Sequence, residues 1–347
     1  MRMIYVGTLD TTPDRDFGWI RAFRDLEVEV LPFSSTPPVV PAGLAGRLLR
    51  RLHIGLANEQ VQSALLDLVE RERPDWVHFR LPVEFHRRTI GALKRHGATL
   101  TQYFNDDAFS KSSPTGIHWR FRRALPLYDA HFVFRMHNVE RYRKAGAAHV
   151  EHCPPFYDPV AHFVPNESGF IADAAFIGHY EADWRLECLE ALARRFDVVL
   201  KGGGWDGPIR NRPIGKLAPI THAFGDEYNR IYAAVVAGLC FFSKINNDTW
   251  TRRALEIVAV GGLLVCERTE EAQLYFKDRE EAFFFSSIEE LVDIVAELKS
   301  NPSKREAVRA AGYRRLVSGQ HTINDRALQI LRYVRSVRQA PHRLPQA

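Results

Sequence analysis

Two carboxylates and their spacing are the first features of the 347-residue chain that could do chemistry. Asp248 and Glu256 stand eight positions apart, shortly before a pair of glycines. The apolar spacing over 250–260 predicts a helix, which the glycines end before a short buried strand. Glu256 falls inside this helix, where it either pairs with Arg252 on a solvated surface or serves a binding site.

Cations and glycines follow several strands that are expected in the second half of the chain. Arg185 comes shortly after Gly178. Lys201 opens a glycine-rich loop that contains Gly203, and Lys244 follows a third strand. Cations and backbone N–H groups at the carboxyl ends of such strands bind phosphate groups. Each position also has a structural alternative, a surface arginine or a simple turn, and the loop matches no P-loop or dinucleotide signature.

Candidates for acid–base chemistry lie in the first half of the chain. Asp106 and Asp107 come just beyond the strand predicted over 99–104, and His137 follows the next predicted strand. An aspartate or a histidine at such a place could accept a proton from a hydroxyl group. The alternative is that the two aspartates cap the following helix.

Composition and charge exclude several classes of protein. The 46% hydrophobic and 26% charged residues are ordinary for a globular enzyme, which excludes disordered and fibrous proteins. A net charge of +5 is compatible with several anionic partners, but no DNA- or RNA-binding fingerprint is present, so no nucleic-acid partner is expected. The first residues do not resemble a signal peptide, and the longest apolar run, 231–242, is too short to span a bilayer. These features predict a cytoplasmic protein.

Cysteine and histidine spacing predicts neither disulfides nor a metal site. The four cysteines lie far apart in predicted helices and strands, as expected of buried reduced thiols. His149 and His152 are an odd number of positions apart on a predicted strand, so their side chains point to opposite faces. We therefore expect no metal ligand set in this chain.

Strand-like and helical segments alternate along the whole chain, which is typical of parallel sheets with helices on both faces. A proline-rich stretch over 154–169 indicates a hinge. The pattern predicts two Rossmann-like α/β domains, over 1–160 and 161–320, that face each other across a cleft. An amphipathic helix within 321–340 is expected to return to the first domain. The main predicted strands lie at 3–7, 28–33, 75–79, 99–104, 130–134, 148–153, 173–178, 197–202, 237–242, 262–266 and 282–286.

Several of these segments together resemble a known family. The stretches "FIGHYEADWRLECLEAL", "DEYNRIYAAVVAGLCFF" and "TRRALEIVAVGGLLVCERTEEAQLYF", the last with an R-x-x-E-x-x-x-x-G block, are similar to the CgeB-type glycosyltransferase family. The segments "YFNDDAF" and "YDAHFVFRMHNVERYRKAGAAHVEHCPPFYDP" resemble its N-terminal domain. The likeness covers most of the chain and extends more distantly to the group 1 nucleotide-sugar glycosyltransferases.

This resemblance implies a GT-B fold and metal-independent glycosyl transfer without a cofactor. The first domain would bind the acceptor, and the second would bind a nucleotide-diphosphate sugar as donor. Glu256 matches the second acid of the family's E-x7-E pair, which binds the ribose hydroxyls, and Asp248 stands where the first glutamate would be. Arg185 matches the family's arginine. An inverting enzyme would use Asp106, Asp107 or His137 as its base.

The acceptor is not identified by the sequence and could be a saccharide, a lipid-linked molecule or a protein. With a lipid-linked acceptor, the basic, leucine-containing segment 46–55 could rest on the anionic inner face of a membrane. We favour the alternative, an ordinary helix start that faces the core. Two rival functions remain open, a nucleotide-sugar epimerase of the same fold and a catalytically silent protein that binds sugar nucleotides or a partner.

Overall fold

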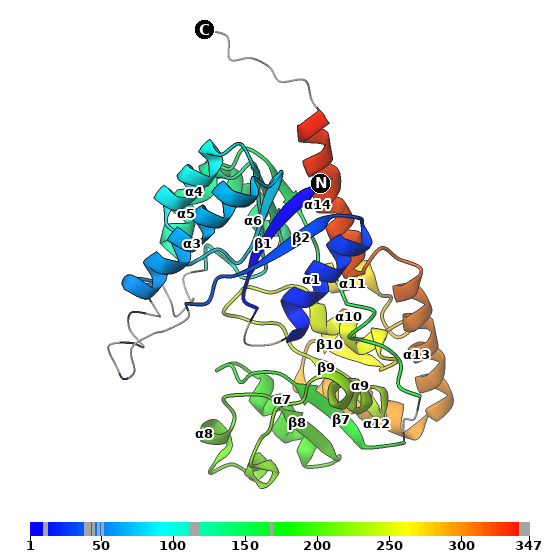
Figure 1. The fold of residues 1–347 in the computed structure, drawn as a ribbon. Coiled ribbons are helices and arrows are strands. Elements are labelled where there is room, and N and C mark those ends of the chain that lie inside the picture. Colours follow the sequence, from blue (N-terminus) through cyan, green and yellow to red (C-terminus); the bar gives the residue numbers. More distant parts are fainter. Residues whose placement is uncertain are drawn as a thin grey trace. The chain divides into compact units, whose positions relative to one another are not determined.

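The computed structural model describes residues 1–9, 13–37, 52–110, 118–166 and 169–339, together with residues 43, 46 and 49 (Figure 1). Residues 47, 48, 50 and 51 of the segment 46–55 therefore lie outside the described residues. Tertiary contacts divide the chain into two units. Unit 1 comprises Met1–Pro154 and Ile323–Ala347, and unit 2 comprises Pro155–Thr322. Each unit has its own sheet, as the alternating sequence pattern predicts.

Unit 1 is built on a six-stranded sheet in the order β2-β1-β3-β4-β5-β6, and all its strand pairs are parallel. Strands β3 and β4 are buried along their whole length because helices cover both faces of the sheet. The strands are β1 (Arg2–Gly7), β2 (Glu29–Ser34), β3 (Trp76–Arg80), β4 (Thr99–Phe104), β5 (Ala130–Val133) and β6 (Val150–His152). The helices are α1 (Pro13–Asp25), α3 (Leu56–Glu72), α4 (Arg87–Arg95), α5 (His118–Ala124), η1 (Leu125–Leu127), α6 (Met136–Lys144) and α14 (Ile323–Gln339).

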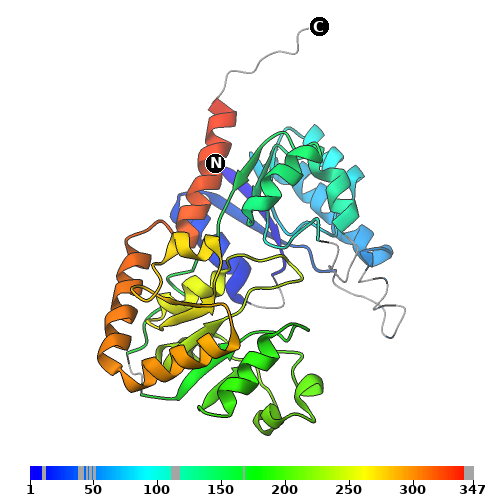
Figure 2. The same cartoon turned by 180° about the vertical axis from the view of Figure 1, so that it is seen from behind.

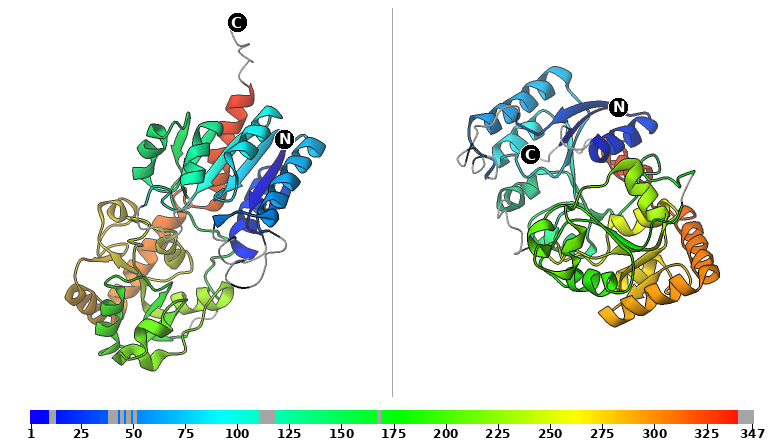
Figure 3. Two further views of the ribbon diagram at one scale, coloured as in Figure 1. Left: turned by 90° about the vertical axis from the view of Figure 1, so that its left-hand side faces the viewer. Right: turned by 90° about the horizontal axis from the view of Figure 1, so that it is seen from below.

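The two faces of the unit 1 sheet pack against different helices. Along β1, Ile4 and Val6 join the core that α3, α4, α5 and α6 cover. Tyr5 faces the other side, where its ring, Trp19 of α1 and His78 of β3 pack as tilted rings in an aromatic cluster. The C-terminal helix α14 packs on α1 and so belongs to unit 1, as Figure 3 shows from two further directions.

Unit 2 has a five-stranded parallel sheet in the order β11-β10-β9-β7-β8. Helices α7 and α12 cover one face, while α9 and α10 cover the other with α13 behind α10. Figure 2 shows α12 and α13 as long orange helices at the margin of this unit. The strands are β7 (Ala172–Ile177), β8 (Val198–Lys201), β9 (Val235–Cys240), β10 (Leu264–Glu267) and β11 (Phe283–Phe285). The helices are α7 (Arg185–Ala193), α8 (Asp206–Ile209), η2 (Pro213–Leu217), α9 (Gly225–Ala233), α10 (Arg252–Ala259), α11 (Glu270–Tyr275), α12 (Ile288–Ser300) and α13 (Pro302–Val317).

Candidate functional site

The loops after β7 and β8 meet backbone to backbone at the carboxyl edge of the unit 2 sheet. The Gly178 N–H donates to the Lys201 carbonyl at 2.9 Å, and the Tyr180 N–H donates to the Gly203 carbonyl at 3.0 Å. Gly202 adopts a φ of +122°, and a Cβ atom there would lie 2.2 Å from the Gly178 carbonyl oxygen. Only glycine fits this approach, so the glycine-rich loop fixes the two chain segments against each other.

Arg253, the second residue of α10, extends to this pair of loops. Its guanidinium carbon lies 5.2 Å from the centre of the Phe176 ring. A Cβ atom on Gly178 would lie 3.0 Å from Nη2 of Arg253, so the guanidinium group lies directly against the loop after β7. Within the described ranges, no hydrogen bond or ion pair engages this guanidinium group. Its N–H donors are therefore available to an anion at the carboxyl edge of the sheet.

Glu256 lies one helical turn further along α10, and its side chain is 16% exposed. Tyr228 donates its hydroxyl to Oε2 at 3.0 Å, while Arg252 Nη2 and His162 Nε2 lie 3.2 Å and 3.8 Å from Oε1. Burial acts to raise the pKa of Glu256, but the charges of His162 and of the two arginines on α10 outweigh it and lower the pKa. The expected pair with Arg252 exists, yet the carboxylate lies in a polar recess and not on an open surface.

An imidazole and a phenyl ring form an exposed aromatic surface near the end of β8. The rings of His222 and Phe224 stack with centres 5.6 Å apart and planes 9° apart, and Phe224 is 63% exposed. The His179 ring lies 6.2 Å from His222. A Cβ atom on Gly203 would lie 3.0 Å from Nδ1 of His179, so this ring rests on the glycine-rich loop. A planar heterocycle could stack on such a surface.

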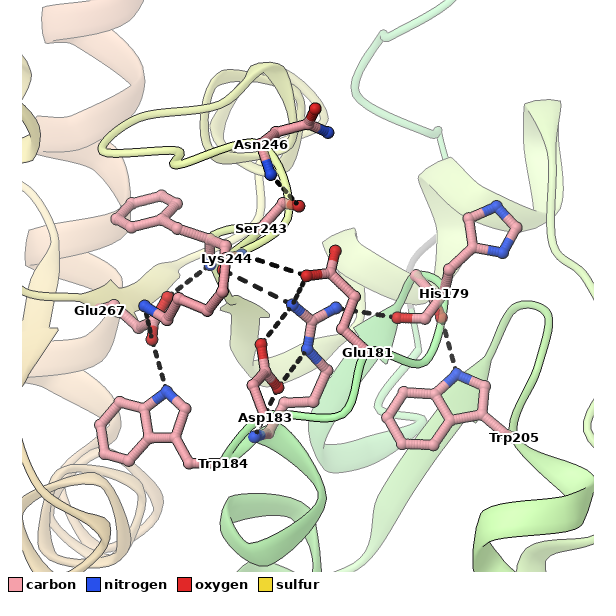
Figure 4. Close-up of polar contacts among 12 residues, drawn as sticks. His179, Glu181, Asp183, Trp184, Trp205, Ser243, Lys244, Asn246 and Glu267 are labelled. Atoms are coloured by element: carbon pink, nitrogen blue, oxygen red, sulfur yellow. Dashed lines mark hydrogen bonds and ion pairs between the residues drawn. The ribbon is translucent and has the colours of Figure 1, made fainter. Parts of the chain in front are cut away.

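Arg185 is buried at the same edge but is already engaged within the chain. Its partners Asp183, Glu181 and His179 are drawn in Figure 4. It donates from Nε and Nη2 to both carboxylate oxygens of Asp183, at 2.8 Å each, and from Nη1 to the His179 carbonyl at 2.9 Å. The Glu181 carboxylate lies 3.4 Å away. Two carboxylates thus surround its charge, so Arg185 fixes the turn between β7 and α7.

The two predicted lysines also have acidic partners. Lys201 Nζ lies 3.1 Å from Glu227 and donates to the Thr221 hydroxyl at 2.8 Å. Lys244 Nζ lies 3.1 Å from Glu267, although its side chain remains 57% exposed. Both lysines lie at carboxyl ends of strands, as predicted, but neither presents an uncompensated charge.

Glu267 and Lys244 line an open pocket of about 410 Å³ at the carboxyl ends of β10 and β11. The buried Glu267 carboxylate accepts hydrogen bonds from the Trp184 indole N–H and the Phe242 backbone N–H. Figure 4 shows Trp184, Glu267 and Lys244 together at this place. The lining residues are Trp184, Lys244, Glu267, Arg268, Thr269, Phe285 and Ser286.

Asp248 lies in the loop between β9 and the start of α10. Its backbone N–H donates to the Ser243 carbonyl at 2.8 Å. Helix α10 begins at Arg252, with Thr251 as its N-cap residue. The loop therefore holds Asp248 close to the carboxyl end of β9.

Asp106, Asp107 and His137 lie at the carboxyl edge of the unit 1 sheet. Asp107 is fully buried, and its Oδ1 accepts the backbone N–H of Phe109 at 2.9 Å. His137 Nε2 and Arg141 Nη1 lie 3.7 Å and 3.4 Å from the other carboxylate oxygen. Asp107 therefore caps a short turn and not the next helix, α5, which begins only at His118, while Asp106 and His137 are partly exposed beside it.

A second polar cluster in unit 1 has no counterpart among the sequence-based predictions. It lies at the carboxyl ends of β1 and β3, where the strand order of the sheet changes direction, with β2 on one side of β1 and β3 on the other. Such a topological switch point is a common ligand site in open α/β sheets. Asp16 accepts hydrogen bonds from the Tyr5 hydroxyl at 2.7 Å and from Arg80 at 3.1 Å. Glu84 is 7% exposed beside Ser35, and burial raises its pKa to about 7.

Sequence reasoning thus missed Arg253 and Glu84. The signal for Arg253 was present, because it is the arginine of the R-x-x-E block quoted above. Glu84 carried no signal, since the sequence over 83–96 predicts a single helix and gives no role to this residue. Helix α4 instead begins at Arg87, because the side chains of Asn58 and Gln62 bond to the backbone of the preceding loop.

The cysteine prediction is confirmed, since all four cysteines are buried and unbonded to one another. In the part of the chain that the structure describes, no group of three or more His, Cys, Asp or Glu side chains could hold a metal ion. His149 pairs with Glu151 at 2.7 Å. None of the described helices is long and apolar enough to cross a membrane.

A family model described as "Glycosyl transferase-like" matches residues 185–332, which is less than half of the chain. This segment contains Arg253, Glu256 and all the residues that line the pocket beside Lys244 except Trp184. No curated protein matches the chain at a significant level.

Solved structures of low sequence identity match almost the whole chain. Sucrose-phosphate synthase from Thermosynechococcus elongatus superposes with a TM-score of 0.70 at 11% identity, covering 98% of this chain and 100% of that chain. HepE from Anabaena, solved with UDP-glucose, superposes with a TM-score of 0.64 at 11% identity, covering 97% of this chain and 100% of that chain. A trehalose 6-phosphate synthase from Burkholderia multivorans superposes with a TM-score of 0.62 at 13% identity, covering 98% of this chain and 99% of that chain.

These structures share the GT-B arrangement of two parallel-sheet α/β domains, which confirms the predicted fold class. The family match likewise supports glycosyl transfer as the reaction class, while nothing in the comparisons reaches the CgeB-type subfamily. The chain thus has the GT-B glycosyltransferase fold, and its residues 185–332 form a glycosyltransferase-like domain.

Proposed function

We propose that the protein transfers a sugar from a nucleoside diphosphate sugar, bound by unit 2, to a hydroxyl acceptor, bound by unit 1. The observation that carries this proposal is the unengaged guanidinium group of Arg253 against the Gly178 loop. When the bond between the sugar and the diphosphate breaks, negative charge gathers on the departing diphosphate. A fixed guanidinium group at that place stabilises this charge without a metal ion.

The neighbouring groups suit the rest of a nucleotide. The ionised carboxylate of Glu256 can accept hydrogen bonds from the two ribose hydroxyls. The stacked rings of His222 and Phe224 offer a surface for the base. Gly178 and Gly203 let the backbone approach the phosphates closely, and Asp248 is assigned to the sugar.

Arg185, Lys201 and Lys244 support this site indirectly in the proposal. Each is bound to a carboxylate of the chain, so each shapes and balances the edge of the sheet. HepE has been solved with UDP and with UDP-glucose, which makes uridine diphosphate the first nucleotide to test.

On the acceptor side, Asp106 and His137 are the proposed bases, with Asp107 holding His137 in place. The base takes the proton of the acceptor hydroxyl as its oxygen bonds to the sugar and the diphosphate leaves. Membership of the CgeB-type subfamily and a cytoplasmic location complete the proposal. The acceptor is a saccharide, a lipid-linked molecule or a protein.

Binding of UDP, GDP, ADP, CDP and dTDP, measured by calorimetry and thermal shift, tests the donor site. We expect one nucleotide to bind the wild type and Arg253→Gln to weaken it at least tenfold, since a charge-assisted hydrogen bond contributes about 1.5–3 kcal/mol. Arg279→Gln is the matched control. The guanidinium carbon of Arg279 also lies over a phenyl ring, 5.6 Å from the centre of Phe283, but Arg279 comes before β11 and so away from the carboxyl edge of the sheet.

Glu256→Gln should weaken the binding of the same nucleotide but leave the binding of inorganic pyrophosphate unchanged, because pyrophosphate has no ribose. The proposal is wrong if no nucleotide binds the folded wild type, or if Arg253→Gln and Arg279→Gln behave alike. Incubation of the bound donor without an acceptor separates a transferase, which at most hydrolyses it slowly, from an epimerase, which converts it.

A further inference from the structure

One surface of unit 1 combines exposed apolar side chains with arginines. Leu56, the first residue of α3, is 84% exposed, Trp119 of α5 is 45% exposed, and Leu52 is 39% exposed. Single exposed apolar residues are common, but three together with four arginines are not explained by packing within the chain. We call these residues the basic-apolar surface; they are Leu52, Leu56, Arg87, Arg88, Trp119, Arg120 and Arg123.

Polar contacts bring these residues together from four segments. Arg120 Nη1 donates to the carbonyl groups of Leu52 at 2.8 Å and His53 at 3.0 Å, which ties α5 to the chain before α3. Arg87 of α4 donates to the Arg123 carbonyl, which ties α4 to α5. Figure 1 shows α3, α4 and α5 side by side, in agreement with their contacts.

Trp119 is the centre of the basic-apolar surface. The guanidinium carbons of Arg120 and Arg123 lie 5.3 Å and 5.7 Å from the centre of its ring. Cations placed in this way hold the indole in an exposed position by cation–π attraction. An indole flanked by guanidinium groups suits the boundary between water and lipid, where tryptophan is enriched.

The charge of this surface is strongly one-sided. Four of its seven residues are arginines, and Glu59, which pairs with Arg88, is the carboxylate bound to them. Arg87, Arg120 and Arg123 are held through backbone carbonyl groups or the indole ring, and no carboxylate among the described residues forms an ion pair with them. The whole chain also carries a net charge of +5, so the surface and the chain have the same sign of charge.

We propose that the basic-apolar surface binds the headgroup region of an anionic lipid bilayer. Leu52, Leu56 and Trp119 enter the boundary region, while the arginines bind lipid phosphates. An RNA strand would satisfy the arginines as well, but it offers nothing to two exposed leucines. Leu52 of this surface belongs to the segment 46–55, for which the sequence leaves a lipid contact open.

Cosedimentation of the full-length protein with vesicles tests this inference, with phosphatidylglycerol and pure phosphatidylcholine vesicles compared at low and high salt. We expect binding to the anionic vesicles alone, weakened by salt. Arg88→Glu should weaken it at least fivefold, because each basic residue near the surface contributes about that factor. Arg71→Glu is the matched control, because Arg71 lies in the last turn of α3, at the opposite end of this helix from Leu56. The side chains of Arg88 and Arg71 are 69% and 67% exposed, and each pairs with one glutamate.

Trp119→Ala should also weaken vesicle binding several-fold, while Phe17→Ala, a side chain of similar exposure on α1, should not. Three outcomes overturn the inference. They are no preference for anionic vesicles, equal effects of Arg88→Glu and Arg71→Glu, or binding to single-stranded RNA that survives Trp119→Ala while the vesicles remain unbound. Nucleotide binding by each variant shows that it is folded and keeps this test separate from that of the donor site.

Discussion

The carboxyl group of Glu84 should make unit 1 less stable as the pH rises through neutrality. Burial raises the pKa of this group from an ordinary value of 4.5 to about 7 in the folded chain. A group whose pKa is raised by folding stabilises the fold fully below its unfolded pKa, and this stability is lost as the pH passes the folded pKa. From pH 5 to pH 8 the folded state therefore loses up to about 3 kcal/mol through Glu84 alone.

Glu84→Gln removes the charge and keeps an oxygen that can accept the bond from Ser35. We expect the variant to match the wild type within about 1 kcal/mol at pH 5 and to exceed it by about 2–3 kcal/mol at pH 8. Glu140→Gln, an exposed glutamate of the same unit, is the control. Hydrogen exchange of β1 and β3 peptides under increasing urea measures the opening of unit 1 separately from unit 2.

A difference between Glu84→Gln and the wild type that stays constant from pH 5 to pH 8 would refute this reasoning. The refuting result would mean that water or a cation reaches the carboxylate and that its pKa is ordinary. A difference of the opposite sign would mean that the folded chain holds Glu84 as an anion.

Two further predictions concern unit 2 and the thiols. Gly202→Ala should lower the free energy of unfolding by at least about 3 kcal/mol, because its Cβ would lie 2.2 Å from the Gly178 carbonyl oxygen. Gly207→Ala is the control and should have no such effect, because a Cβ there would meet no atom within 4 Å. Urea denaturation compares the two variants, and equal stabilities would contradict the close approach of the two loops. Burial raises the pKa of three of the four thiols to about 12 and that of the fourth well above its ordinary value. A thiol reagent at pH 8 should therefore react with no thiol of the folded protein and with all four after unfolding. Rapid labelling of the native protein would contradict this burial.

Most strands could be predicted because parallel strands that are buried on both faces read as short apolar runs. The run 237–242 became β9 at 235–240, and 99–104 became β4 without change. Boundaries set by tertiary contacts could not be found in this way. The start of α4 is an example, since it depends on side chains of α3 that lie more than twenty positions earlier.

The candidate site was predictable only in part, for a physical reason. Sequence reasoning correctly located cations at the carboxyl ends of strands, yet it could not show which of them are already neutralised. Arg185 is enclosed by Asp183 and Glu181, whereas Arg253, on the helix after β9, remains open to an anion. The difference depends on which carboxylates the turns bring close, and no spacing rule records that.

The position of α14 also has a consequence for how the chain folds during synthesis. Unit 1 is made of two separate chain segments, and the buried side chains of Ile323, Ile330 and Leu331 complete its packing. A ribosome adds about 5–20 residues per second, so α14 emerges about 10–30 s after residue 154. Unit 2 ends at Thr322, so its entire sequence has been made before α14 begins, while α1 waits without its partner helix. We therefore expect the second unit to finish folding first, in reverse of the order of synthesis.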